Sequence, residues 1–296
     1  MNIKLSMSIL SLVFIVTPSM TMATEGGGLG IYPDGLENYM SGALPSSGIH
    51  VLMYGGNAHY NQVRDDNGNK TPIPNFSVNV NMLAPRLIWV TEHKVLDGQL
   101  AFHSILPFLD ITAKSFKNKY TSRGLGDMTL GTALGFHTSP NLHYVLGLDI
   151  YVPTGDYKQS DPSSLGKNYW AAQPVWAISY APNKGISADI KMMYDFNFRN
   201  NETKTRSGQA YHADYALGWA FGNGWVAGIG GYAYLQTTDD IGPNSAQGKA
   251  RAFSLGPSFR YVNQQSLLLT AKWQKEFSVR NRPEGSQFFL KASIPF

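Results

Sequence analysis

The chain has 296 residues, of which 43% are hydrophobic, 12% aromatic and only 15% charged, and its formal net charge is +4. It contains no cysteine, which excludes disulfide-stabilised folds and cysteine-ligated metal sites. The aromatic content argues against intrinsic disorder, and so small a net charge does not indicate a nucleic-acid-binding protein.

Residues 1–23 have the features of a cleaved secretory signal peptide. Lys4 supplies the positive charge, residues 10–16 form the centre of an apolar stretch, and residues 21–23 are an acceptable small-residue cleavage site. The apolar stretch is too short to cross about 30 Å of hydrocarbon. The sequence therefore predicts an exported protein whose mature chain begins at Thr24.

Residues 24–47 show no regular alternation of polar and apolar side chains, and they include six glycines and two prolines. We expect a separate segment on the periplasmic side, before the folded domain. Leu29, Ile31 and Tyr39 favour some burial, because large apolar side chains are stabilised away from water. Two arrangements stay open: a plug inside the lumen of the domain, or a loose arm.

Residues 48–296 alternate between polar and apolar side chains with a period of two. In residues 186–199, Ile186, Ile190 and Phe196 fall on one face, and Asp189 and Lys191 fall on the other. This alternation predicts a strand with one apolar side, and its 14 residues exceed the five or six that are usual in globular proteins. We predict twelve such segments, near residues 48–60, 76–92, 98–114, 124–138, 142–153, 168–181, 185–199, 208–222, 224–239, 249–262, 265–280 and 285–296. Within the second segment the polarity changes phase at Pro85 and Arg86, which predicts a β-bulge.

The predicted connections differ in length at the two ends of the strands. Short turns are expected near residues 95–97, 139–141, 182–184, 223 and 263–264. Longer polar loops are expected at residues 61–75, 115–123, 154–167, 200–207, 240–248 and 281–284. Short turns at one end and long loops at the other are typical of bacterial outer-membrane barrels. We therefore predict an all-β fold, a transmembrane antiparallel up-and-down barrel of about 12 strands, with short periplasmic turns and longer extracellular loops.

The partners expected for such a barrel follow from its surface. The terminal Phe296, preceded by apolar residues at alternate positions, is similar to the signal that the barrel assembly machinery reads in outer-membrane proteins. Basic side chains in the loops, such as Lys117 and Lys119, predict contacts with lipopolysaccharide phosphates. We expect a monomer in contact with outer-membrane lipids, with a small-molecule solute and without a nucleic-acid partner.

The polar face of the strands is expected to line a lumen narrower than that of a sixteen-stranded porin. The candidate lumen residues are Tyr151, Asp189, Lys191, Asp195, Arg199, His212, Asp214, Tyr232, Tyr234, Gln236, Arg260, Lys272 and Glu276. They either pair with one another in a stable wall, or line a solute path in which Tyr232 and Tyr234 stack against an aromatic solute. We expect no cofactor and no metal site, since the spacing of His137, His143 and His212 is unspecific. No nucleophile is found beside a base, so no catalytic residues are assigned.

Several short motifs occur in an order that resembles a known family. They are Gly124–Asp127, residues 153–157, Tyr232 with Tyr234 and Gln236, and the closing Pro295 and Phe296. Their order is similar to that in the outer-membrane family named for the meta-pathway of phenol degradation, over nearly the whole mature chain. The resemblance implies a barrel that takes up phenolic or other small hydrophobic compounds.

Together, the barrel pattern and the resemblance predict a passive channel for small aromatic or hydrophobic solutes. Two alternatives stay open. One is an outer-membrane enzyme that acts on lipid, and the other is a closed barrel with a structural or adhesive role.

Overall fold

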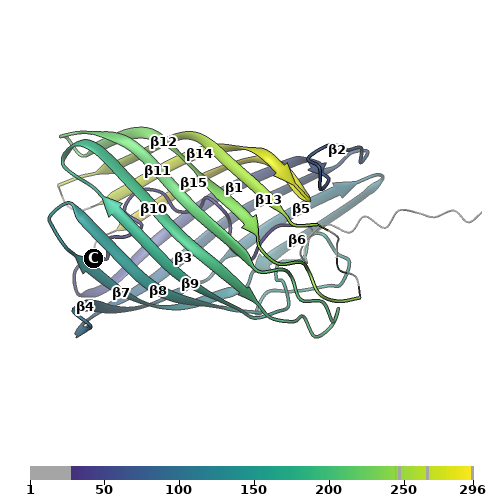
Figure 1. Cartoon of the computed structure of the whole chain (residues 1–296), viewed down its shortest axis with the longest axis horizontal. Helices are drawn as coiled ribbons and strands as arrows, with labels where there is room; N and C mark the ends of the chain where they lie inside the picture. Colours follow the sequence, from purple (N-terminus) through teal and green to yellow (C-terminus); the bar gives the residue numbers. More distant parts are fainter. Residues whose placement is uncertain (1–27, 244, 246–247, 265–266, 295–296) are drawn as a thin grey trace, which may run out of the picture.

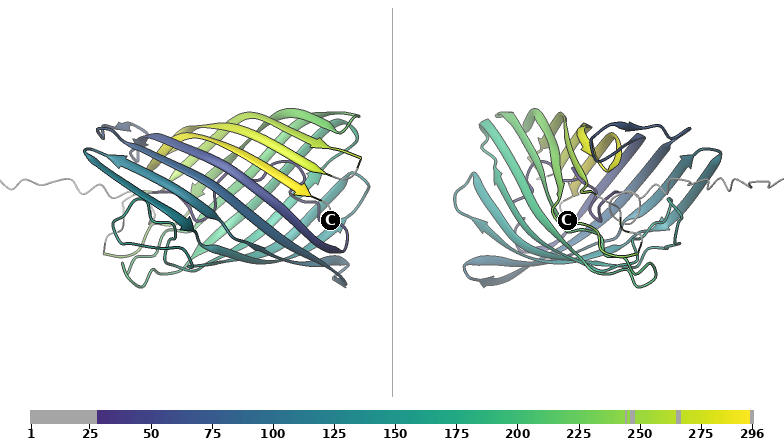
Figure 2. Two further views of the ribbon diagram at one scale, coloured as in Figure 1. Left: turned by 180° about the vertical axis from the view of Figure 1, so that it is seen from behind. Right: turned by 45° about the vertical axis from the view of Figure 1, so that its right-hand side comes forward.

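The computed structural model describes residues 28–243, 245, 248–264 and 267–294. Its strands form one antiparallel sheet in which the first long strand pairs with the last, so the sheet closes into a 12-stranded barrel (Figures 1 and 2). The predicted fold class is therefore confirmed. The expected signal peptide and Phe296 lie outside the described residues. Within that part of the chain, no helix is long and apolar enough to cross a membrane.

The strands are β1 (Gly48–Arg64), β2 (Lys70–Thr71), β3 (Ser77–Val95), β4 (Gly98–Ile105), β5 (Phe108–Ser115), β6 (Asn118–Leu125), β7 (Met128–His137), β8 (Leu142–Val152), β9 (Ala171–Tyr180), β10 (Lys184–Asn197), β11 (Ala210–Phe221), β12 (Trp225–Gln236), β13 (Arg251–Val262), β14 (Leu268–Arg280) and β15 (Arg282–Ile294). β2 is a two-residue strand in the connection from β1 to β3.

Two of the barrel strands are interrupted at mid-length. Along β3 from Val90 to Ser77, β4 and β5 pair in a single register, and Pro107, which has no N–H group to donate, lies between them. β6 and β7 form the next barrel strand. Ile105 pairs with Thr129 and Phe108 pairs with Leu125, so the β6–β7 side has one residue more than its partner. Residues 126–127 are thus a β-bulge.

Two predicted loops are wrong, at residues 115–123 and 281–284. β5 and β6 form a hairpin that turns at Phe116 and Lys117, and β14 turns into β15 at Asn281, whose φ is 51°. The β5–β6 hairpin extends beyond its neighbours at this end of the barrel (Figure 1), and its sequence has polar residues at successive positions, so the alternation fades there. The β14–β15 turn is level with its neighbours, since Arg280 pairs with Arg251 and Arg282 pairs with Arg64. The remaining long connections, at residues 65–76, 153–170, 198–209 and 237–250, do gather at this same end, although β1 continues to Arg64 into the predicted loop at residues 61–75.

The predicted bulge at Pro85 and Arg86 is also wrong. The register between β1 and β3 is unbroken from the Gly48–Val90 pair to the Tyr60–Val78 pair. Arg86 therefore keeps the parity of its strand and faces the lumen, and Pro85 faces outward.

The two faces of the barrel differ sharply in burial and polarity. On the outer face Trp176 is 48% exposed and Leu217 is 50% exposed, whereas on the inner face Gln173 is fully buried and Lys272 is 1% exposed. An exposed apolar band of this kind matches the hydrocarbon of a bilayer. The polar core of the molecule lies inside the barrel, and any functional site that is buried lies there as well.

Candidate functional site in the barrel lumen

A chain segment that precedes β1 occupies the lumen along its length. This lumen segment, residues 28–47, begins beside Arg282 at the loop end of the strands. It continues through Tyr39, which is fully buried, to Leu44, which packs against Ala133 and Val145 near the turn end. It then joins β1. The segment is visible inside the barrel as the purple trace in Figures 1 and 2.

In the part of the lumen segment nearer the loop end of the barrel, residues 33–36 form a tight turn. The backbone N–H of Leu36 donates to the carbonyl of Pro33 over 3.0 Å, and Gly35 has a φ of +82°. A turn with this φ at its third residue favours glycine. A Cβ atom at Gly35 would also collide with the side-chain amide of Gln274 on β14. Glycine is thus required here both by the backbone and by the wall.

Asp214 on β11 binds this turn with its carboxylate. It accepts hydrogen bonds from the hydroxyl of Tyr32 (2.7 Å), the backbone N–H of Gly35 (2.7 Å) and the backbone N–H of Glu37 (2.8 Å). Hydrogen bonds to an ionised acceptor are the stronger kind. The carboxylate of this one wall residue therefore holds the segment at three positions, Tyr32, Gly35 and Glu37.

Glu37 is the main contact between the lumen segment and the cations of the wall. Its carboxylate accepts from the Tyr54 hydroxyl and the Lys291 ammonium, each over 2.8 Å, and it pairs with Arg86 over 3.4 Å. Burial alone would raise the pKa of Glu37. The positive charges of Lys291, Lys191 and Arg86 outweigh burial and hold this pKa well below its usual range. The carboxylate is thus ionised and neutralises a buried cation, Lys291, and a partly buried one, Arg86.

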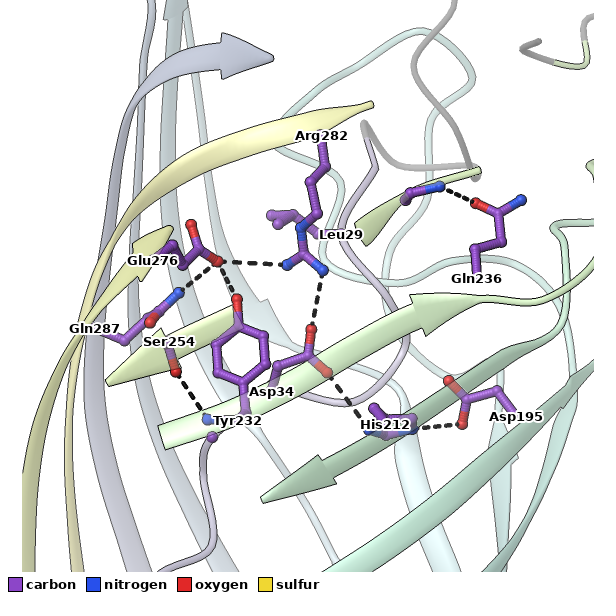
Figure 3. Close-up of polar contacts among 12 residues, drawn as sticks. Leu29, Asp34, Asp195, His212, Tyr232, Gln236, Ser254, Glu276, Arg282 and Gln287 are labelled. Atoms are coloured by element: carbon purple, nitrogen blue, oxygen red, sulfur yellow. Dashed lines mark hydrogen bonds and ion pairs between the residues drawn. The ribbon is translucent and has the colours of Figure 1, made fainter. Parts of the chain in front are cut away.

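Asp34 belongs to a chain of charged groups that crosses the lumen (Figure 3). Its carboxylate lies 3.2 Å from a guanidinium nitrogen of Arg282 and 3.4 Å from Nδ1 of His212. Nε2 of His212 in turn lies 3.1 Å from Asp195 on β10. Burial raises the pKa of Asp34 to about 6, against the opposing effect of Arg282. Two strands on different sides of the lumen are thereby connected through one residue of the segment.

Residues 37–41 of the lumen segment, nearer the turn end of the barrel, are held by further side chains of the wall. The Ser258 hydroxyl donates to the side-chain oxygen of Asn38 over 2.6 Å, and the backbone N–H of Ser41 donates to Asp189 over 3.1 Å. Lys272 donates to the carbonyl of Glu37 over 2.6 Å. These contacts come from three different strands, so the segment is attached around much of the lumen.

The aromatic candidates lie buried beside the lumen segment. The hydroxyl of Tyr232 donates to Glu276 (Figure 3), and the ring of Tyr234 lies 4.7 Å from the Arg282 guanidinium. Tyr232 is fully buried and Tyr234 is 1% exposed. While the lumen segment is in place, both rings therefore contact protein groups and not solvent.

The structure buries nearly all of the candidate residues predicted from the sequence, and one is an exception. Arg199 lies beyond the end of β10, is exposed, and donates to the carbonyl of Lys204 in its own loop. It does not face the lumen, because β10 ends at Asn197. The buried candidates are Tyr151 on β8, Asp189, Lys191 and Asp195 on β10, His212 and Asp214 on β11, Tyr232, Tyr234 and Gln236 on β12, Arg260 on β13, and Lys272 and Glu276 on β14.

Four of these residues contact groups other than those described above. Tyr151 donates to Gln173, and Lys191 lies 4.8 Å from the centre of the Tyr32 ring. Arg260 lies 6.0 Å from the Tyr39 ring. Gln236 differs from the rest: it bonds to the loop at residues 237–250 and not to the lumen segment.

The sequence interpretation misses three residues that are central to the site: Arg86, Arg282 and Glu37. Arg86 was hidden by the expected bulge, although its parity with the buried Ile88 assigns it to the lumen. Arg282 falls in a predicted loop, and Glu37 falls in a segment without periodicity. Only the first carried a usable signal in the sequence.

The histidines do not converge on one site. His137 and His143 face each other across the β7–β8 hairpin with their Nδ1 atoms 2.8 Å apart, whereas His212 contacts Asp34 and Asp195. Among the described residues, no three His, Asp or Glu side chains are grouped so that they would hold a metal ion.

Comparison with known proteins gives structural neighbours and a family. No curated protein matches the chain. An outer membrane channel from Pseudomonas putida F1 has a TM-score of 0.75 at 17% identity, covering 88% of this chain and 99% of that one. At this identity it shows the fold alone.

Two further neighbours are more distant and carry no argument. A Pseudomonas aeruginosa FadL homologue has a TM-score of 0.41 at 11% identity and covers 94% of this chain and 98% of its own. The transport unit of the Escherichia coli autotransporter AIDA-I has a TM-score of 0.45 at 8% identity, with 89% and 95% covered.

The family comparison is more specific. The model of the family described as "Putative MetA-pathway of phenol degradation" matches residues 60–292, most of the barrel. The chain belongs to this family, as the order of its motifs predicts.

Proposed function

We propose that this protein is a bacterial outer-membrane channel through which small solutes diffuse passively, and that the lumen segment closes it. The observation that carries the proposal is the way in which the segment is held. The segment is attached to the wall by its own Asp34 and Glu37 side chains and by the side chain of Asp214 on β11. The ladder of the barrel wall is complete without the segment. A segment held in this way can leave the lumen without opening the wall. The description of the P. putida neighbour as a channel agrees with this.

We further propose that the solute is a phenolic or another small hydrophobic compound. The family description names phenol degradation. Tyr232 and Tyr234 border the space that the segment fills, and they would line the path once it is displaced. Their rings offer stacking, and their hydroxyl groups offer hydrogen bonds, to an aromatic solute. The proposal assigns the chain no catalytic step.

Planar-bilayer conductance of the purified protein tests the proposal. The wild type is compared with a variant that lacks residues 28–43, after heat-modifiable gel migration has shown that both barrels fold. We expect rare, small steps from the wild type and frequent, larger steps from the deletion variant. Silence from a folded and inserted deletion variant would contradict a channel and would favour the closed structural barrel.

A second arm tests the solute. Added phenol should reduce the conductance of the deletion variant, and the further substitutions Tyr232→Ala and Tyr234→Ala should abolish that reduction. Tyr180→Ala, on the outer face, is the matched control. Equal block in all three proteins would leave the channel but remove the aromatic path.

A further inference from the structure

Three arginines surround a recess at the loop end of the strands. Arg64 of β1, Arg251 of β13 and Arg280 of β14 line it, together with Ser278 and Glu284, and its volume is about 420 Å³. Glu276 also lines the recess, but its carboxylate pairs with Tyr232 and Arg282 on the lumen side. None of the three arginines takes part in the lumen contacts described above.

The charges of this recess are unequally matched. Glu284 is paired with Arg64, whose Nε lies 2.5 Å from the carboxylate. Arg251 and Arg280 are direct cross-strand partners, a placement in which like charges repel. Among the described residues, Arg251 donates only to the carbonyl and hydroxyl of Ser278, over 3.2 and 2.9 Å.

Arg280 is exposed and has no acceptor among the described residues. Asp65 and Asp66 in the β1–β2 connection accept from Asn67 and Asn69 and form no ion pair with Arg280 in the described part of the chain. Within those residues, the recess thus holds two guanidinium groups that pair with no carboxylate.

Apolar rings lie next to these guanidinium groups on the same outward face. Phe253 of β13 lies on the outer face, two residues before Leu255 on the same face. Phe277 of β14 is the direct cross-strand partner of Phe253. The two rings are stacked with centroids 6.1 Å apart, and Phe277 is 50% exposed. Arg251 and Arg280 follow these residues toward the loop end. A molecule bound here would meet cations at the rim and aromatic rings further into the apolar band.

We propose that the recess binds the phosphate group of an outer-leaflet lipid such as lipopolysaccharide, with the acyl chains of the lipid against Phe253 and Phe277. Guanidinium groups match phosphate oxygens in a bidentate geometry, and their repulsion is relieved when a dianion lies between them. The proposal rests on the outer-membrane location given under the proposed function. It commits to a membrane lipid and not to free phosphate, because the apolar rings contribute nothing to a free anion.

Binding is measured on the full-length protein in detergent, by native mass spectrometry. The probes are bis-phosphorylated lipid A, dephosphorylated lipid A and inorganic phosphate. The variant Arg251→Ala/Arg280→Ala is compared with Lys94→Ala/Lys184→Ala, which removes two exposed cations at the turn end of β3 and β10. We expect the arginine variant to bind bis-phosphorylated lipid A at least 10-fold more weakly than the wild type, and the lysine variant to bind it as the wild type does.

Three results would overturn the proposal. The first is equal binding of phosphorylated and dephosphorylated lipid A. The second is equal binding of lipid A by the arginine variant and the wild type, and the third is inorganic phosphate binding as tightly as the lipid. The conductance of the deletion variant is recorded in parallel. If the wild type does not bind the lipid but the deletion variant still shows channel steps, only this proposal is contradicted. If the lipid binds but the deletion variant shows no steps, the proposed channel is contradicted.

Discussion

The barrel wall and the lumen segment lie against each other, but they are held by different forces. The wall is a continuous ladder of backbone hydrogen bonds, as in the unbroken register between β1 and β3. The lumen segment has no ladder, and its attachment depends on a few carboxylates: Asp34, Glu37 and Asp214. Wall stability is therefore distributed over many residues, whereas segment docking is concentrated in single side chains. Substitutions at these carboxylates should release the segment and leave the wall intact.

The largest effect is expected for Glu37→Gln. The substitution leaves the buried Lys291 and the partly buried Arg86 without their countercharge, at a cost of about 3 kcal/mol in docking free energy. The fraction of time that the channel is open, measured by conductance, should rise roughly 100-fold. Glu92→Gln, on an exposed part of β3, is the control. An equal rise of open time in both variants would contradict this role of Glu37. Unfolding of the Glu37→Gln barrel at a lower temperature in the gel assay would show that docking of the segment and stability of the wall are not independent.

A smaller effect is expected for Gly35→Ala. The positive φ costs an alanine about 1–2 kcal/mol, and its Cβ must displace Gln274. Open time should rise roughly 10-fold. Gly55→Ala in β1 provides a comparison within the wall, because no atom lies within 4 Å of an added Cβ there. An unchanged open time in the Gly35 variant would show that the turn does not control docking.

The smallest effect is a pH dependence through Asp34. Its pKa is raised to about 6 in the docked state, from about 4 in water, so docking binds a proton between these values. Raising the pH from 4 to 6 removes this proton and weakens docking, and open time should increase over that window. The Asp34→Asn variant should lack this component. A decrease over the same window, or an unchanged slope in the variant, would contradict the assignment.

The wall was largely predictable from the sequence, for a physical reason. Strand side chains alternate between two environments, so residues such as Ile186 and Asp189 report which face meets hydrocarbon. The information is lost where strands leave the membrane. Both faces of the β5–β6 hairpin are polar at its tip, and for this reason residues 115–123 resemble a loop.

The lumen site was predictable only on its wall side. Asp214 and Lys272 follow from parity, but their partners in residues 28–47 do not, since an irregular segment carries no period that relates sequence to position. The hydrogen bonds of Asp214 to Tyr32 and Gly35 join residues about 180 positions apart in the chain. Such pairings depend on the path of the segment through the barrel, which only the structure provides.

The most direct test is to tether the lumen segment reversibly to the wall. Asn38 and Ser258 are joined by a 2.6 Å side-chain hydrogen bond, and the chain has no cysteine of its own. The double variant Asn38→Cys/Ser258→Cys should therefore form one disulfide across the lumen. With the cross-link verified by gel mobility, conductance should be silent in the oxidised protein and should return on reduction. Equal conductance in the oxidised and reduced forms would contradict a channel that opens by release of residues 28–47.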